Sequence, residues 1–381
     1  MSMPVFVLAP DSFKESMTAR EVCLAMEAGL RKVFPHAEYI HVPMADGGEG
    51  TARSLVDASG GQMFSVTVTG PEGQPVLAEY GIMGDGETAV IEMASASGLQ
   101  HTCRSCRNPL VTTTYGTGEL IRACLDRNIK KVILGIGGSA TNDGGAGMAE
   151  ALGVRFYDEA GNSLSRGGLA LTKLHHIDLS GLDPRLSAVE ILVACDVTSP
   201  LCGPHGASVV FGPQKGATPE MVSALDAALS HYAAVISQTL HKDIANVPGA
   251  GAAGGLGAGL LAFTVCQLRR GIDIVIEYSG LRNKLVNASY CFTGEGCIDF
   301  QTRVGKTPLG VAHTAKEMQV PVIAVSGLIG DGTEILYQEG IDAIFGIIPR
   351  ASDIEELLRN GPQNMQRTCE NIGRLLRLSD K

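Results

Sequence analysis

Short apolar segments alternate with amphipathic segments at both ends of the chain, and a different pattern separates the two ends. Near the N-terminus this alternation predicts strands at residues 5–8 and 37–42, each followed by a helix, at residues 19–33 and 50–58. Near the C-terminus it predicts strands at residues 289–293, 320–326 and 343–348 and helices at residues 307–317, 333–339 and 354–378. Strand–helix–strand order gives right-handed crossovers and a parallel sheet. The two ends together therefore predict one five-stranded parallel sheet.

The middle of the chain has another texture. Residues 62–93 alternate with period two and are broken by the turn sequences GPEGQP and GDGE, a pattern typical of an antiparallel meander. Beyond it the pattern predicts helices at residues 118–127, 219–237 and 254–268 and strands at residues 131–135, 190–194 and 207–211. We therefore expect an α/β protein of two domains, which suits a length of 381 residues. The doubly wound domain takes residues 1–62 and 287–381, and residues 63–286 form an inserted mixed α/β domain.

Composition excludes several classes of protein. The net charge of −10 argues against a nucleic-acid partner, which would require a basic patch. The N-terminus reads directly as a strand without a signal peptide, and the small-residue tract 248–266 is not a membrane span, so we expect a cytoplasmic protein. Ten scattered cysteines favour free thiols, and the single CxxC of Cys103 and Cys106 is a weak signal for zinc or redox chemistry.

Two polar clusters follow the first two predicted strands. APDSFKES (9–16) places Asp11, Ser12, Lys14 and Ser16 near a helix N-terminus, where hydroxyls and an ammonium attract anions. MADGGEGT (44–51) adds Asp46 and Glu49. Ligands of a doubly wound sheet bind beyond the carboxyl ends of its strands, so both clusters are candidate site segments. The alternative for Ser16 is a plain helix cap, which Thr18 would provide equally well.

The strongest local signal is LGIGGSATNDGGAGMAEAL (134–152), in which a strand runs into glycine-rich backbone and then into a helix. Successive N–H groups of such a loop bind phosphate oxygens, while hydroxyl and carboxylate groups address phosphate and Mg²⁺. It is neither a Walker A sequence nor a GxGxxG fingerprint. The candidate residues for phosphate or substrate are Gly137, Gly138, Ser139, Thr141, Asn142 and Asp143.

Two further regions complete the candidate site. Asp196 follows the predicted strand 190–194, where a carboxylate can accept a substrate hydroxyl proton or hold a metal, and Lys215 follows in FGPQKGAT as a cation for phosphate or carboxylate. FTGEGCIDFQTRVGKTP (292–308) contributes Gly294, Glu295, Asp299, Gln301 and Lys306. An ammonium at a helix N-terminus opposes the helix dipole, so Lys306 needs an anionic partner.

Taken together and in order, these motifs resemble the type I glycerate kinases. APDSFKES, ADGGEGT, GIGGSATNDGGAGM, ACDVTSPLCGPHGAS, FGPQKGAT, PGAGAAGGLGAG and TGEGCID carry the resemblance, over about residues 3 to 350. It implies ATP-dependent phosphorylation of D-glycerate with Mg²⁺, generally to 2-phosphoglycerate, and a flavodoxin-like (Rossmann-like) domain with the other domain inserted. One position departs from the family pattern, because Cys297 stands where an arginine is usual.

The sequence thus predicts a kinase that works in a cleft between its two domains, with ATP and Mg²⁺. We expect Asp196, Lys14, Lys215 and Asp46 to be catalytic. The metal ligands would come from Asp196, Glu295 and Asp299, with Asp46 as a competitor, and whether Asp196 is base or ligand stays open. The alternatives are a kinase for another small hydroxy acid, a non-catalytic nucleotide or sugar-acid sensor, and an NAD(P)-dependent reductase. The phosphorylated hydroxyl, the adenine-binding loops and a monomeric or homodimeric state are also open.

Overall fold

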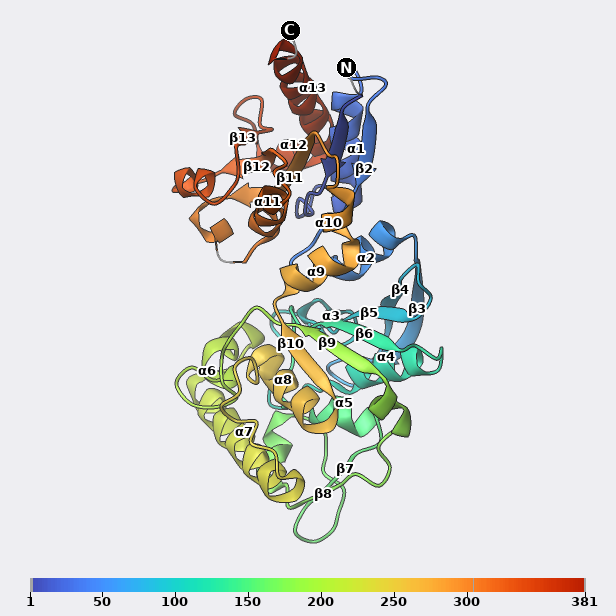
Figure 1. The fold of residues 1–381 in the computed structure, drawn as a ribbon. Coiled ribbons are helices and arrows are strands. Elements are labelled where there is room, and N and C mark those ends of the chain that lie inside the picture. Colours follow the sequence, from blue (N-terminus) through green and yellow to red (C-terminus); the bar gives the residue numbers. More distant parts are fainter. Residues whose placement is uncertain (1–2, 304, 380–381) are drawn as a thin grey trace. The chain divides into compact units, whose positions relative to one another are not determined.

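Both ends of the chain contribute strands to one five-stranded parallel sheet in the computed structural model, which describes residues 3–303 and 305–379. Its strands are β1 (Val5–Leu8), β2 (Glu38–His41), β11 (Tyr290–Ile298), β12 (Val322–Ile329) and β13 (Ala343–Gly346). They lie in the order β13-β12-β11-β1-β2, so the predicted five-stranded sheet is confirmed. Figure 1 shows β11, β12 and β13 from the C-terminal part of the chain and β2 from the N-terminal part in the same unit. The chain passes from β1 to β2 on one side and returns at β11 on the other. The strand order therefore reverses between β1 and β11, the place where such sheets bind ligands.

Within the described residues, the first compact unit comprises the chain up to Asp46, Arg53–Gly60 and the chain from Ile272 onward, and the second comprises Gly47–Ala52 and Gly61–Gly271. These limits place residues 272–286 in the first unit. The domain limits inferred from the sequence stay a proposal.

The helices predicted at residues 19–33, 50–58 and 307–317 are present, those predicted nearer the C-terminus differ, and the helices α9 and α10 were not predicted. They are α1 (Ala19–Leu30), α2 (Thr51–Ser59), α9 (Gly271–Ser279), α10 (Leu281–Lys284), α11 (Thr307–Glu317), α12 (Ile354–Arg359) and α13 (Gly361–Ser379), with 3₁₀ turns η5 (Phe300–Arg303) and η6 (Thr333–Tyr337). The single helix predicted at residues 354–378 is wrong, because Pro362 cannot continue a helix but suits the first turn of a new one. The helix predicted at residues 333–339 is a 3₁₀ turn.

Helix α1 lies directly against α13 in the first unit. A Cβ added to Gly29 would stand 2.2 Å from the carbonyl oxygen of Gln366, so the close approach requires glycine. Apolar side chains from the two helices and from the sheet form one buried cluster, which includes Phe6, Leu8, Met26, Leu30, Phe292, Met365 and Cys369. This packing fixes the sheet whose carboxyl ends carry the first candidate cluster.

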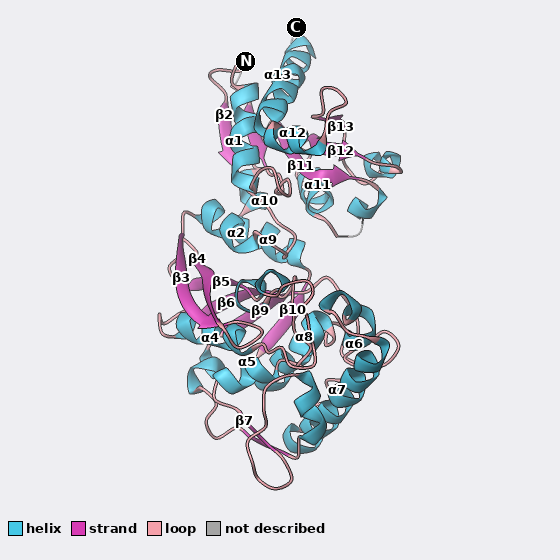
Figure 2. Ribbon diagram, turned by 180° about the vertical axis from the view of Figure 1, so that it is seen from behind, coloured by secondary structure: helices cyan, strands magenta, loops and turns pink. Residues whose placement is uncertain are grey.

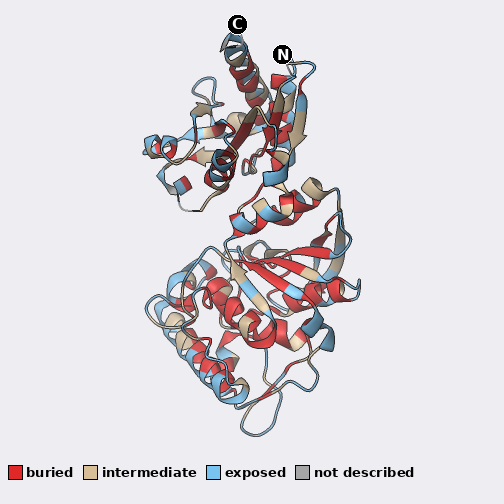
Figure 3. Ribbon diagram, in the orientation of Figure 1, coloured by how far each residue is buried: buried red, intermediate tan, exposed pale blue. Residues whose placement is uncertain are grey.

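The second unit is built on a six-stranded mixed sheet with the order β10-β9-β6-β5-β4-β3 (Figure 2). The strands are β3 (Gln62–Thr69), β4 (Pro75–Ile82), β5 (Thr88–Glu92), β6 (Lys131–Gly135), β9 (Glu190–Ala194) and β10 (Cys266–Arg269). The predicted meander is confirmed, since β3–β4 and β4–β5 are antiparallel. It joins a parallel set through β5–β6, β6–β9 and β9–β10. Figure 3 shows that the central strands β5, β6 and β9 are buried.

Helices and short turns surround this sheet. They are α3 (Ala94–Ser97), α4 (Tyr115–Leu125), α5 (Ala146–Ala151), α6 (Ala207–Phe211), α7 (Pro219–Leu240) and α8 (Ala252–Phe263), with η1 (Leu99–His101), η2 (Gly168–Lys173), η3 (Pro184–Ala188) and η4 (Pro213–Lys215). A small antiparallel pair, β7 (Arg155–Tyr157) and β8 (His176–Asp178), completes the unit.

Two predictions in this region are wrong. Residues 207–211 are helical, because burial of Ala207 and Ser208 with exposure of Val209 and Val210 overrides the strand preference of valine. The helix predicted at residues 254–268 ends at Phe263, and its last predicted residues belong to β10.

The structure bears on the expectations of free thiols and of no membrane span. Cys103 and Cys106 form a disulfide, so the expectation of free thiols is wrong for this pair. The free thiols are Cys23, Cys124, Cys195, Cys202, Cys266, Cys291, Cys297 and Cys369. In the described residues, no helix has both the length and the apolar character needed to cross a membrane.

Candidate active site

The loops that follow β1 and β2 meet the second half of β11, beyond the last residue of β11 that pairs with β1. The amide of Asp11 donates to the carbonyl of Gly294 at 2.9 Å, and the amide of Met44 donates to that of Pro10, also at 2.9 Å. These bonds continue the sheet beyond its strands and hold the segments that bear Asp11 and Glu295 side by side. The first unit thus brings the APDSFKES and TGEG motifs together at the point where the strand order reverses.

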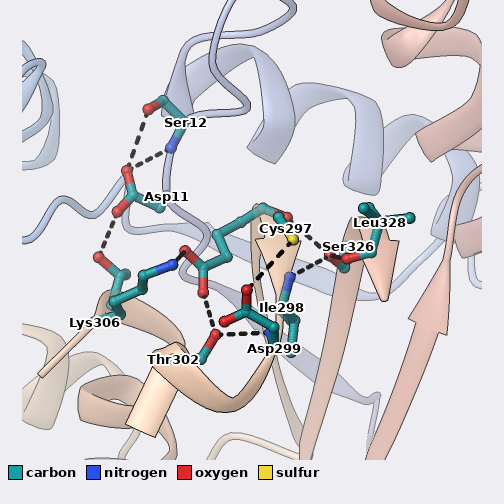
Figure 4. A network of polar contacts seen from close by, with 11 residues as sticks. Asp11, Ser12, Cys297, Ile298, Asp299, Thr302, Lys306, Ser326 and Leu328 are labelled. Carbon is teal, nitrogen blue, oxygen red and sulfur yellow. Dashed lines mark hydrogen bonds and ion pairs between the residues drawn. The ribbon is translucent and has the colours of Figure 1, made fainter. Parts of the chain in front are cut away.

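The carboxyl group of Asp11 has a raised pKa. Its Oδ1 accepts a hydrogen bond from the amide of Ser12 at 2.6 Å (Figure 4). Its Oδ2 accepts one from the hydroxyl of Thr307 at 2.5 Å. Burial raises the pKa of Asp11 to about 7, and the neighbouring carboxylates of Asp46 and Glu295 push in the same direction against the lowering effect of those hydrogen bonds. Several negative groups therefore share one poorly solvated place, where a cation or a proton would be favoured.

Glu295 lies beside the start of α11. Its Oε1 accepts the hydroxyl of Thr302 at 2.7 Å, and its Oε2 receives the ammonium of Lys306 at 3.2 Å. Burial nevertheless raises the pKa of Glu295 above its usual value. Lys306 is the N-cap residue of α11, and Glu295 is the anionic partner that the sequence required for it.

The rest of this motif lies on the same end of β11. The thiol of Cys297 donates to Asp299 Oδ2 at 3.9 Å, and the amide of Asp299 donates to the hydroxyl of Thr302 at 3.2 Å. Figure 4 shows the bond between Asp299 and Thr302. Because the Thr302 hydroxyl also donates to Glu295, it connects Asp299 to Glu295. Gln301 belongs to η5, and its side chain lies outside the described residues.

The loop after β1 presents Lys14 to solvent. The amide and carbonyl groups of Phe13 and Met17 bond to each other, and Glu15 has a φ of 62°, so the residues between them form a tight turn. Lys14 is exposed in this turn, which places its ammonium where an anionic ligand can reach it. Ser16 instead donates its hydroxyl to the carbonyl of Leu358 at 2.6 Å, and the N-cap of α1 is Thr18.

The raised pKa of Asp11 predicts a dependence of stability on pH. The folded state holds a proton up to about pH 7, whereas the unfolded chain releases it near 3.8, so the free energy of unfolding falls as pH rises through this window. Asp11→Asn lacks this titration. We expect the variant's stability relative to the native chain to grow from about pH 4 to about pH 7 and then level off. Urea unfolding in Mg²⁺-free buffers checks this, and a pH-independent difference would contradict it.

In the second unit, residues 47–52 lie over the carboxyl ends of β6 and β9. A Cβ on Gly47 would stand 2.8 Å from the Cα of Gly271 and 2.9 Å from the Cβ of Ala194, and one on Gly135 would meet the carbonyl of Gly47 at 2.8 Å. The backbone of Gly137 is close to that of Gly48, since an added Cβ would lie 3.7 Å from the Cα of Gly48. This edge therefore places predicted residues from three distant motifs around one short segment.

Exposed groups at this edge are the ones that a ligand can reach. Gly137 and Gly138 are exposed backbone at the end of β6, Glu49 is exposed, and Ser139 is buried directly after them. Asp196 is exposed just beyond β9, and its Oδ1 accepts the amide of Gly271 at 3.0 Å. One oxygen of Asp196 is thereby fixed in position at the carboxyl end of a parallel strand.

The close approach at Gly47 predicts a difference between two similar substitutions. Gly47 and Gly50 have φ values of 95° and 90°, so alanine at either position costs about 1–2 kcal/mol of strain. Only at Gly47 would the new methyl group also collide with neighbouring atoms, which adds about 1–3 kcal/mol, whereas at Gly50 nothing lies within 4 Å. We expect Gly47→Ala to unfold at clearly lower urea concentration than Gly50→Ala. Equal midpoints would show that this packing is unimportant.

Four predicted residues of the second unit are buried away from solvent. Thr141, Asn142, Asp143 and Lys215 have exposures of 0%, 0%, 1% and 1%. Both carboxylate oxygens of Asp143 accept the hydroxyl of Thr114, and Oδ2 accepts its amide at 2.8 Å, so Asp143 joins α4 to the start of α5. The ammonium of Lys215 donates to the carbonyl of Thr141 at 2.6 Å, and burial lowers the pKa of Lys215 to about 7. These contacts hold the glycine-rich loop in place on its buried side.

Sequence reasoning left out residues that the structure places in these clusters. Thr302 and Thr307 bind Glu295 and Asp11, and both lie inside the motif that named Lys306. Glu92 ends β5, its Oε1 accepts the amide of Ala52 at 2.8 Å, and burial raises its pKa. An acidic residue directly after an apolar strand is the same signal that identified Asp46, and it would have found Glu92.

Comparison with known proteins decides the family. The family model described as "Glycerate kinase family" matches residues 6–377. The chain is 52% identical to the glycerate kinase of Haemophilus influenzae, over 97% of this chain and 98% of that one, and 50% identical to the glycerate 2-kinase of Escherichia coli, over 97% of each. A crystal structure of a protein from Salmonella typhimurium LT2, provisionally named glycerate kinase 2, superposes with a TM-score of 0.92 at 49% identity over the whole of both chains.

The chain belongs to the glycerate kinase family. The resemblance drawn from the motifs is confirmed, and so are the α/β fold class and the assignment as a kinase. The roles of individual residues, and the cleft predicted between the two domains, stay predictions.

A magnesium ion suits the donors of the first unit. In the described parts of the chain, no three His, Cys, Asp or Glu side chains are arranged to hold a metal by themselves. A magnesium site does not require that, because Mg²⁺ commonly takes one or two carboxylates and completes its shell with water and substrate phosphates. Asp11 and Glu295 are half-buried and, with Asp46 close to Asp11, offer the hard oxygen donors that Mg²⁺ prefers.

Proposed function

We propose that this member of the glycerate kinase family transfers the γ-phosphoryl group of ATP to D-glycerate, with Mg²⁺, and that the product is 2-phosphoglycerate. The observation that carries the proposal is the cluster of Asp11, Glu295, Lys306 and Thr307 at the reversal of strand order, in a chain half identical to a glycerate 2-kinase. Phosphoryl transfer needs positioned charges more than covalent chemistry. Such a cluster supplies them.

The residues of the first unit would bind the polyphosphate and its metal. Lys14 is exposed and free to approach phosphate oxygens, and Ser12 offers a hydroxyl beside it. Glu295 and Asp11, with Asp299 and Asp46 near them, would hold Mg²⁺, which when bound neutralises charge on the phosphate oxygens. Lys306 would balance the negative charge of Glu295 before the ion arrives.

The residues of the second unit would bind and activate the acceptor. The exposed backbone of Gly137 and Gly138, followed by Ser139, suits an anionic carboxylate, because N–H groups in glycine-rich turns bind anions. Asp196 would accept the proton of the attacking hydroxyl, since its carboxylate is exposed and held by the Gly271 amide. The glycine-rich loop would be held in place on its buried side by Thr141, Asn142, Asp143 and Lys215.

The test is phosphorus NMR of a reaction that contains the protein, D-glycerate, ATP and Mg²⁺. We expect a new phosphomonoester signal and ADP. In a proton-coupled spectrum, a phosphate on carbon 2 is split into a doublet by one proton, whereas a phosphate on carbon 3 is split into a triplet. A triplet would overturn the proposed regiochemistry, and the absence of any phosphomonoester would overturn the proposed substrate.

The other functions considered from the sequence give different results in the same sample. Phosphorylation of another small hydroxy acid, with none of D-glycerate, would favour a related kinase of different specificity. A thermal shift with ATP and no ADP release on any hydroxy acid would favour a sensor. Loss of nicotinamide absorbance with hydroxypyruvate would favour a reductase, against which the missing GxGxxG fingerprint counts.

A further inference from the structure

A polar cavity of about 470 Å³ lies in the first unit, beyond the end of β13 and between α12 and α13. Its size falls within the range of pockets that bind small molecules. It is lined mainly by polar side chains with hydrogen-bonding groups, among them Arg350, Glu356, Asn360, Gln363, Asn364 and Arg367. The carboxyl end of a strand in a doubly wound sheet is also where ligands bind.

The lining residues retain unused hydrogen-bonding capacity. In the described chain, the carboxamide groups of Asn360, Gln363 and Asn364 have no hydrogen-bond partner within the protein, and no carboxylate forms an ion pair with Arg367. Arg367 makes one long bond, 3.4 Å, to the carbonyl of Ile347. Arg350 is instead paired with Glu356 at 3.0 Å. The cavity therefore combines neutral amides and one available guanidinium with a balanced charge pair.

This combination contrasts with another cavity, in the second unit. That cavity measures about 280 Å³ and contains Arg166, whose guanidinium binds both carboxylate oxygens of Glu150 at 3.0 and 3.1 Å and lies 3.4 Å above the ring of Tyr115. Arg166 and Glu150 of this cavity are thus already paired with each other. The cavity beside α13 is thus the better candidate for a ligand.

The cavity adjoins the loop that carries Asp11, Ser12 and Lys14. Ser16 of that loop donates to the carbonyl of Leu358, and its Oγ lies 2.2 Å from the place where a Cβ of Gly361 would stand. Leu358 and Gly361 flank Asn360, which lines the cavity. A ligand in the cavity would therefore have the predicted phosphate-binding loop next to it.

We propose that this cavity binds the adenosine part of ATP, an inference that rests on the proposed kinase function. Carboxamides match adenine, because each offers a donor and an acceptor to the N7 acceptor and the 6-amino donor of the base. A guanidinium plane stacks on a base, which suits Arg367, and a carboxylate such as Glu356 accepts bonds from ribose hydroxyls. The triphosphate would then extend toward Ser12 and Lys14.

The experiment is calorimetric titration of the full-length protein with ADP in the absence of glycerate. We expect Arg367→Ala and Asn364→Ala each to weaken ADP binding by about tenfold or more. Arg377→Ala is the matched control, since Arg377 is an exposed arginine of the same helix that does not line the cavity, and its affinity for ADP should equal that of the native chain. Circular dichroism confirms that each variant is folded, and Arg367→Lys provides a second, less disruptive variant.

Two comparisons separate adenosine binding from phosphate binding. Asn364→Ala should leave the affinity for inorganic tripolyphosphate unchanged and should reduce the preference for ADP over inosine diphosphate, whose base has a carbonyl in place of the amino group. Unaltered ADP affinity in both cavity variants, no ADP binding by the native chain, or equal losses for ADP and tripolyphosphate would overturn the proposal. Failure of the proposed kinase function would appear elsewhere, as missing phosphoglycerate in a protein that still binds ADP.

Discussion

Replacing Asp196 with asparagine is expected to lower kcat for D-glycerate phosphorylation by about 10²–10⁴-fold. The side chain is exposed just beyond β9, and Oδ1 is fixed by the Gly271 amide at 3.0 Å. Asparagine keeps an oxygen for that bond and has nearly the same shape, but it cannot take a proton from the substrate hydroxyl. The loss should therefore fall on kcat, with little change in the KM for glycerate.

Asp178→Asn is the matched control for this substitution. Asp178 also lies in the second unit and also accepts a backbone amide, from Ser180 at 2.8 Å, but it belongs to β8 and to none of the predicted site motifs. Its substitution should leave kcat unchanged. Steady-state rates by coupled detection of ADP, with urea midpoints for both variants, make the comparison. Native turnover in Asp196→Asn would remove this residue from the chemistry.

The sequence was sufficient to predict the frame of the site because one topological rule connects strand ends to ligands. Asp11, Asp46 and Asp196 each follow a strand in the structure. Glu295 lies within β11, beyond the last residue of that strand that pairs with β1. Their separation along the chain did not matter. Parallel pairing of β1 with β11 brings residues almost 300 positions apart into contact, as the 2.5 Å bond between Thr307 and Asp11 shows.

Burial within loops was beyond such reasoning. Lys215 and Asp143 lie in polar, glycine-rich sequence that predicts exposed backbone, yet both side chains are enclosed. Whether a loop residue faces a ligand or the protein depends on which other loops cover it, and those contacts are set by tertiary packing. The helix at residues 207–211 was missed for the same reason, because burial of Ala207 and Ser208 decides its conformation against local preference.

The partnership of Lys306 with Glu295 illustrates a middle case. An ammonium at a helix N-terminus is unfavourable without a nearby anion, so we predicted an anionic partner for Lys306, with a bound phosphate as the obvious candidate. The structure supplies a carboxylate eleven residues earlier, at 3.2 Å. A protein anion and a phosphate are not exclusive, since the Lys306 side chain is one-third exposed and can exchange one partner for the other when a ligand binds.

The same pair gives the second large prediction. Replacing Glu295 with glutamine should raise the free Mg²⁺ concentration needed for half-maximal activity by about 10–100-fold and lower kcat by about 10²-fold. Glutamine retains an oxygen for the hydroxyl of Thr302, but it removes the negative charge that would attract the metal. Lys306 would also lose its ion-pair partner and leave uncompensated positive charge where the ion must bind.

The measurement is activity titrated with free Mg²⁺ at fixed, saturating ATP and D-glycerate. Glu339→Gln serves as the control, because Glu339 lies in the same unit, pairs with Arg303 and His313, and stands outside the cluster. A parallel titration of Asp299→Asn tests the competing ligand. A shifted Mg²⁺ requirement in Asp299→Asn with none in Glu295→Gln would assign the metal to Asp299, and an unshifted requirement in both would mean that neither carboxylate holds it. A shift in Glu295→Gln agrees with a metal bound beside Asp11, because Mg²⁺ there would offset the negative charge that Glu295 and Asp46 place around Asp11.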